Sequence, residues 1–105
     1  MSVEYWEFNM PRKGEMGDMD KYEQSIRDNA KDFVVAGFQP GSSVRSYMRF
    51  DNLRYAIEYG KQLLKDEVRL RSILVYALDE YEHHALVGTM NRHDMTWKEV
   101  KPKIY

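Results

Sequence analysis

The chain of 105 residues contains no cysteine. Disulfide bonds, thiolate metal ligands and cysteine nucleophiles are therefore excluded, and small secreted domains usually depend on disulfides. Long hydrophobic runs are lacking too, because no apolar stretch approaches the roughly 20 residues of a membrane-spanning helix. The acidic and aromatic residues 1–7 do not resemble a signal peptide. We therefore expect a cytoplasmic protein that does not associate with a membrane.

The sequence also lacks the short motifs of nucleotide and acyl-transfer chemistry. It contains no Gly-x-Gly-x-x-Gly, no Walker loop and no Gly-x-Ser-x-Gly. The glycine-containing segment 37–43 carries Pro40, where a phosphate-binding loop needs free backbone N–H groups. We therefore expect a protein that is not an enzyme and that uses no cofactor.

The composition suits one small globular domain spanning residues 1–105. Hydrophobic residues make up 43% of the chain and charged residues 31%, which is enough apolar material for a single core. The net charge of −1 gives no overall attraction to nucleic acid. The charges are unevenly placed, however, since acidic residues dominate 1–40 and basic residues dominate 41–75. The middle of the chain is therefore the basic part.

The first third of the chain is expected to form a strand, a loop and a helix. Side chains of residues 2–10 alternate loosely between two faces, and the segment ends at Pro11, which indicates a strand. The one proline and two glycines of 11–18 indicate a loop. Asp20 and Glu23 have the spacing of a capping box, so a helix should follow and end near residues 36–38. Its apolar stripe consists of Tyr22, Ile26, Ala30, Phe33, Val34 and Gly37. Residues 37–43 are expected to form a loop.

A strand followed by an amphipathic helix is the clearest pattern of the sequence. From Val44 to Phe50 the period is two, which places Ser46 and Met48 inward. The outward row is basic and consists of Arg45, Tyr47 and Arg49. Asp51 can cap a helix whose apolar stripe consists of Leu53, Ala56, Ile57, Gly60 and Leu64. A glycine on this stripe indicates close packing against a sheet.

The segment 67–88 has two interpretations, a single helix or a β-hairpin. The hairpin pairs 73–78 with 85–90 across a turn at 79–82, and a further strand at 96–100 would complete a meander before Pro102. We favour the hairpin, with residues 102–105 as a frayed tail. The expected fold is therefore α+β, a single domain with two helices and a mainly antiparallel sheet of three to four strands. The alternative is an all-α arrangement of four helices.

The densest group of titratable side chains lies in the expected turn at 79–82 and the residues after it, and it is a candidate metal site. Glu80 and His83 have the i, i+3 spacing by which a helix presents two ligands to one ion, and His84 follows directly. Helical di-iron sites need this motif twice, and the sequence has one copy. On a hairpin turn these side chains are instead a solvated loop tip. A metal-dependent protein is therefore the second alternative function.

The basic row offers a surface for nucleic acid. Arginine forks grip phosphate and tyrosine rings stack on bases, so a strand presenting Arg45, Tyr47 and Arg49 could hold single-stranded nucleic acid, with Arg54 nearby. The chain is not basic overall, and outer sheet faces often carry such charges to prevent association. Nucleic-acid binding is therefore the first alternative function.

The main hypothesis is an interaction module that binds another protein. Two Trp, eight Tyr, four Phe and seven Met are many for so small a core, and these residue types are enriched at interface centres. Trp6 and Trp97 near the two termini would make one patch if the terminal strands are neighbours. A small accessory or inhibitory protein of phage or mobile-element type fits this description, and a homo-oligomer is compatible with it.

Overall fold

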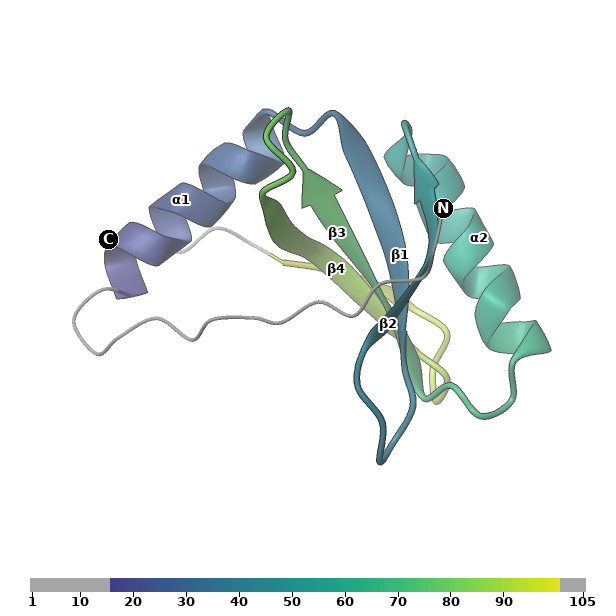
Figure 1. Ribbon diagram of the computed structural model, residues 1–105. Coiled ribbons are helices and arrows are strands. Elements are labelled where there is room, and N and C mark those ends of the chain that lie inside the picture. Colours follow the sequence, from purple (N-terminus) through teal and green to yellow (C-terminus); the bar gives the residue numbers. More distant parts are fainter. Residues whose placement is uncertain (1–15, 101–105) are drawn as a thin grey trace.

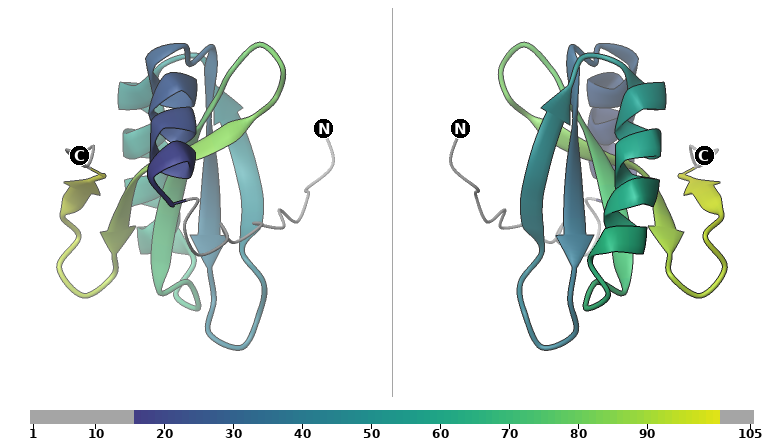
Figure 2. Two further views of the ribbon diagram at one scale, coloured as in Figure 1. Left: turned by 90° about the vertical axis from the view of Figure 1, so that its left-hand side faces the viewer. Right: turned by 90° about the vertical axis from the view of Figure 1, so that its right-hand side faces the viewer.

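Two helices lie on opposite faces of one antiparallel sheet in the computed structural model, which describes residues 16–100 (Figures 1 and 2). In chain order the elements are α1 (Met16–Asp28), β1 (Asp32–Phe38), β2 (Arg45–Phe50), α2 (Leu53–Asp66), β3 (Ser72–Leu78), β4 (His84–Asn91) and β5 (Trp97–Glu99). Within these residues the sheet has five strands in the order β2-β1-β3-β4-β5. The α+β fold is confirmed, and the all-α alternative is not supported.

The predicted helix at 20–36 is wrong in its second half. The helix α1 begins at Met16, inside the segment expected to be a loop, and ends at Asp28, and β1 then runs from Asp32 to Phe38 into the segment expected as the next loop. As the second strand of the sheet, β1 is covered on both faces, and Val34, Val35 and Ala36 are all buried. A strand buried on both faces is continuously apolar, so it shows no period of two.

The strand and helix expected around 44–64 are confirmed as β2 and α2. The N-cap lies one residue after the predicted Asp51, because Oδ1 of Asn52 accepts hydrogen bonds from the N–H groups of Arg54 at 2.8 Å and Tyr55 at 3.3 Å. A Cβ atom at Gly60 would lie 2.7 Å from Cδ1 of Ile73, which confirms the close packing of α2 on the sheet. The core lies in this layer, around Val35, Leu64, Ile73 and Val75.

The favoured hairpin is confirmed, because β3 and β4 pair antiparallel around the turn 79–83. The strand expected at 96–100 is also present as β5, which pairs with β4. Residues 2–10 and the tail 102–105 lie outside the described residues, as does most of the loop expected at 11–18. No helix in the described part of the chain is long and apolar enough to cross a membrane.

Arg92 joins the end of β4 to the end of α2. Its Nε donates a 2.7 Å hydrogen bond to the carbonyl oxygen of Leu70, and its Nη2 donates to the carbonyl oxygens of Leu64 and Glu67. These carbonyls belong to the last turn of α2 and the segment after it, where backbone acceptors have no partner within the helix. A cation at this helix end also suits the negative end of the helix dipole. Arg92 therefore caps α2 from a distant part of the chain.

Candidate functional site

A β-bulge in β2 divides the basic row that the sequence predicted. Val35 of β1 pairs with Met48 and Ala36 pairs with Ser46, so Tyr47 is an extra residue in β2. Arg45 pairs with Gly37 and Arg49 pairs with Val34, and residues three apart in a strand point to opposite faces. Arg45 and Arg49 therefore lie on different faces of the sheet and do not form one row with Tyr47.

Arg49 lies in a network of ion pairs that joins three segments of the chain. Its Nε is 2.8 Å from Oδ2 of Asp32, and Nη1 and Nη2 grip the carboxylate of Glu82 at 3.0 and 3.1 Å. The hydrogen bonds to Glu82 raise the pKa of Arg49. Partial burial acts to lower this pKa, and the hydrogen bond to Asp32 acts to raise it further. The β3–β4 turn that carries Glu82 leans toward β2 in Figure 2. The guanidinium group is therefore already hydrogen-bonded to two carboxylates, which balance its charge within the fold.

Tyr47 turns inward rather than outward. Its ring packs against the core cluster, and a Cβ atom at Gly37 would lie 2.9 Å from its Cε2. On the neighbouring flank of α2, Tyr59 packs against Phe50 with ring centroids 5.3 Å apart. Burial raises the pKa of Tyr59, and the nearby Tyr47 adds to the shift. These rings fill the junction between β2 and α2, so Tyr47 is partly buried against the core and is not part of an outward row for stacking on bases.

Apolar side chains nevertheless remain exposed beside this junction. Met48 pairs with the buried Val35 and so faces the α2 side of the sheet, yet 47% of it is exposed. Tyr55 lies one helical turn before Tyr59 on the same flank of α2 and is 59% exposed. Phe50 and Tyr59 are in ring contact across β2 and α2, and the exposed Met48 and Tyr55 lie two residues along the strand and one helical turn away from them. We call these four residues the β2–α2 ledge.

The ledge borders an open edge of the sheet. Within residues 16–100, β2 has a strand neighbour on one side only, namely β1. The backbone groups on the outer side of such a strand can pair with another extended chain. Arg45 makes no ion pair with the described part of the chain and lies on the same face as the ledge. The site thus combines backbone donors and acceptors, exposed apolar side chains and one uncompensated cation.

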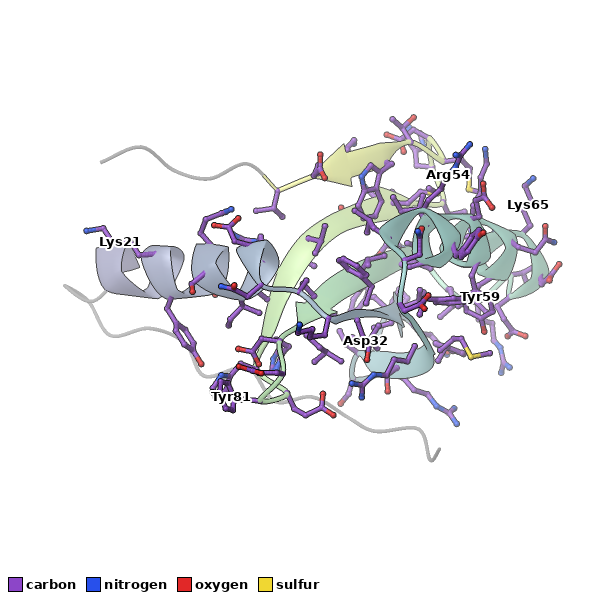
Figure 3. The ribbon with its side chains drawn as sticks, turned by 90° about the horizontal axis from the view of Figure 1, so that it is seen from above. Lys21, Asp32, Arg54, Tyr59, Lys65 and Tyr81 are labelled. Atoms are coloured by element: carbon purple, nitrogen blue, oxygen red, sulfur yellow. The ribbon has the colours of Figure 1, made fainter. Side chains whose placement is uncertain are left out.

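The other predicted binding residues lie elsewhere or have structural roles. Figure 3 shows Arg54 on the flank of α2 toward β5 and Tyr59 on the flank toward β2, and Arg54 pairs with Glu58 at 3.8 Å. Trp97 of β5 packs against the core cluster, and a Cβ atom at Gly88 would overlap its ring. Trp6 lies outside the described residues. Trp97 therefore helps to close the core.

The histidines and carboxylates of the β3–β4 turn do not gather into a metal site. Among the described residues, no three His, Asp or Glu side chains are close enough to hold one ion. Asp79 accepts hydrogen bonds at 2.9 Å from the N–H groups of Tyr81 and His83, and the His83 ring lies 3.1 Å from its other oxygen. Desolvation acts to raise the pKa of Asp79, but these bonds together lower it. Asp79 therefore shapes the turn.

Glu80 and His84 are the other candidate metal ligands, and the turn and the start of β4 determine where they lie. Glu80 is exposed, and in Figure 3 the neighbouring Tyr81 lies on the outer side of the β3–β4 turn. His84 begins β4 and is half-buried, and its ring packs edge-on against Tyr76 with centroids 5.9 Å apart. Desolvation lowers the pKa of His84, with His83 adding to this and Glu23 opposing it. The His84 ring therefore packs into the fold and does not share a metal site with Glu80.

Comparison with protein-family models, with curated proteins and with solved structures finds no match to this chain.

The sequence did not indicate the ledge, because the predicted alternation placed Met48 on the inward face of the strand. The detectable signal was the spacing of Tyr55 and Tyr59, four residues apart on a helix that directly follows a strand.

Proposed function

We propose that this protein is a non-enzymatic interaction module that binds an extended segment of another protein along β2. The observation that supports this proposal is the β2–α2 ledge, where Met48 and Tyr55 are exposed beside an edge strand with one neighbour among residues 16–100. Extended peptides commonly bind such edges, where main-chain hydrogen bonds supply affinity and flanking pockets select alternate side chains. Tyrosine and methionine are also enriched at the centres of interfaces.

The charges around the edge indicate the chemistry of the bound segment. Arg45 is the cation on the ledge side of β2 without a partner in the described chain, so an acidic side chain in the segment would pair with it. The favoured partner therefore has apolar residues at alternating positions and at least one Asp or Glu. Nucleic acid is disfavoured, because Arg49 is neutralised by Asp32 and Glu82 and Tyr47 packs into the core.

The proposal is tested by selecting ten-residue peptides from a displayed random library against the full chain. The selected peptides are expected to alternate apolar with other residues and to contain Asp or Glu. They should bind the Tyr55→Ser variant about 30-fold more weakly than the unchanged protein, as expected for loss of an interface hot spot. Val68→Ser is the matched control, because Val68 is 77% exposed in the loop after α2, away from the ledge. Equal losses of peptide affinity in the Tyr55→Ser and Val68→Ser variants would refute the placement of the binding site on the ledge.

A second arm tests the first alternative function. Labelled single-stranded DNA and RNA are titrated against the full chain at low and high salt, together with the Arg45→Ala and Arg49→Ala variants. The proposal predicts no saturable binding to either nucleic acid. Salt-dependent binding that is lost in both variants would contradict it and would favour a nucleic-acid interface.

A further inference from the structure

Two arginines face each other where the β3–β4 ladder ends. The N–H group of Arg92 donates a 2.8 Å hydrogen bond to the carbonyl oxygen of Arg71, one position beyond the last pair of the ladder. Residues opposed in this way send their side chains to the same face of the sheet, with Cβ atoms about 5 Å apart. This face is the α2 side, because the next pair on it, Ile73 and Met90, packs in the core cluster with Leu64 of α2. Like charges in directly opposed positions destabilise a sheet, and an anion between them would remove that penalty.

Backbone carbonyls, and not a carboxylate, hold the Arg92 guanidinium group in place. Its Nε and Nη2 donate to the carbonyl oxygens of Leu64, Glu67 and Leu70. A guanidinium group has five N–H donors, so the two on Nη1 are left without a partner in the described chain. No Asp or Glu side chain between residues 16 and 100 forms an ion pair with Arg92. Arg92 therefore presents a fixed positive charge that no acid neutralises, and two donors that remain available.

Arg71 and Arg92 line a cavity together with Asn91 and His93. Its volume is about 510 Å³, and none of these lining residues is acidic. The end of α2, the start of β3 and the turn after β4 lie together at this end of the sheet (Figure 1). Arg71 and His93 are exposed, and their side chains make no hydrogen bond within residues 16–100. The cavity therefore offers two guanidinium groups and an imidazole, which carries an N–H donor in either protonation state.

The turn that carries His93 is fixed by its own contacts. The N–H group of Met95 donates a 2.8 Å hydrogen bond to the carbonyl oxygen of Asn91. The Asp94 carboxylate pairs with Lys98 at 3.0 Å, so its charge does not balance the two arginines. Met95 has a φ of 55°, a left-handed conformation that methionine rarely adopts, and it packs against the core cluster. Such strained residues persist where the surrounding structure holds them, and they concentrate at binding sites.

These features fit a phosphate monoester better than other common anions. Near neutral pH such a group carries a charge of about −1.5 to −2, which two guanidinium groups balance. A carboxylate or a phosphodiester carries a single negative charge. Charge-assisted hydrogen bonds from arginine to phosphate are short and strong. A cavity of about 510 Å³ also lies within the range of small-molecule sites, about 300–1,000 Å³, so there is room for an organic group beyond the phosphate.

We propose that Arg71, Arg92 and His93 bind the phosphate group of a small phosphate monoester. Arg92 is fixed before the ligand arrives and donates from Nη1. Arg71, whose side chain is unpaired in the described chain, closes on the phosphate from the opposite strand, and His93 donates from the turn. The site is separate from the β2–α2 ledge, because β4 lies three strand spacings from β2, about 14 Å.

The ligand class is tested by titrating phenyl phosphate, inorganic phosphate and sulfate into isotope-labelled full chain, with amide and arginine Nε–H signals followed by NMR. The expected result is saturable shifts at Arg71 and at residues 91–93. Phenyl phosphate should bind about tenfold tighter than inorganic phosphate, because its ring is buried in the cavity. No saturable shifts at these residues would overturn the proposal. Equal affinity for phenyl phosphate and either inorganic anion would overturn the monoester and indicate an unselective anion site.

Arg71→Gln tests the placement, because it removes the charge of an exposed side chain and leaves the bonds of Arg92 intact. It should weaken phenyl phosphate binding about tenfold or more, as expected for loss of a charge-assisted hydrogen bond. Arg69→Gln is the matched control, because Arg69 is exposed and does not line the cavity. This variant should retain the affinity within about twofold, since solvent and salt screen a charge outside the site. Equal weakening in the two variants would show that general positive charge attracts the anion, and it would overturn the site.

A phosphorylated side chain of a protein partner presents the same chemical group as a small monoester. Free O-phosphoserine is therefore compared with a pool of peptides that carry phosphoserine between random flanking residues. Similar affinities for both support a small ligand. Peptides that bind about 100-fold tighter and shift residues outside the cavity would overturn a small ligand and indicate a phosphorylated partner. None of these measurements involves the ledge, so their failure would leave the proposed peptide binding at β2 intact.

Discussion

Replacing Arg92 with methionine is expected to destabilise the fold by about 3 kcal/mol. The guanidinium group donates to three backbone carbonyls, of Leu64, Glu67 and Leu70. Hydrogen bonds from a charged group contribute about 1.5–3 kcal/mol each when buried. Arg92 is partly exposed, so about 1 kcal/mol for each of the three bonds is the appropriate figure here. Methionine retains the apolar stem and removes only the donors and the charge.

Urea denaturation followed by circular dichroism measures this loss. At a slope of about 1.5 kcal/mol per molar, the midpoint should fall by about 2 M. Arg71→Met is the matched control, because the Arg71 side chain is exposed and makes no hydrogen bond with the described chain; it should change stability by less than about 0.5 kcal/mol. Arg92→Lys should be intermediate, since an ammonium lacks the fork that reaches several carbonyls. Equal midpoints for Arg92→Met and Arg71→Met would refute the capping role.

Two further changes test the packing and the pH dependence of the fold. Gly60→Ala should destabilise by about 1–2 kcal/mol in urea denaturation despite its better helix propensity, because its Cβ would lie 2.7 Å from Cδ1 of Ile73. In an Ile73→Val background, which removes Cδ1 but keeps the Cγ1 atom 3.1 Å away, the penalty should become smaller, and additive losses would contradict the contact. Burial raises the pKa of Tyr76 from 10.0 to about 12. The folded state therefore holds this proton more tightly than the unfolded chain, and the resulting stability is lost as the pH rises from 10.0 to about 12. The Tyr76→Phe variant should show a smaller decline in the free energy of unfolding over this pH range. The same decline in both proteins would contradict a raised pKa of Tyr76.

Local periodicity predicted β2 and α2, because each pattern reflects one covered and one open face. The β3–β4 hairpin was predicted instead from two apolar runs on either side of a polar turn, and Val75 to Leu78 of β3 are all buried. Local periodicity failed at β1, where Val34, Val35 and Ala36 are buried between two layers. A continuous apolar run placed directly after an amphipathic helix reads as more of that helix. The distinction depends on where the segment lies in the sheet, which tertiary pairing decides.

The candidate site was predicted only in part, for a related reason. The sequence identified β2 as the element to inspect, but it assumed unbroken alternation through Tyr47. The bulge depends on the register of β2 against β1, and it moves Arg45 and Arg49 to different faces. Likewise, nothing near Arg92 in sequence indicates its role, because its acceptors lie 22 to 28 residues away.

The most direct test of the docking surface is an amide chemical-shift map of the full chain bound to the tightest peptide from the library. We expect the largest shifts on β2, from Arg45 to Phe50, and on the flank of α2 that carries Tyr55 and Tyr59. Shifts concentrated on β5, or on the turn 79–83, would contradict this docking surface.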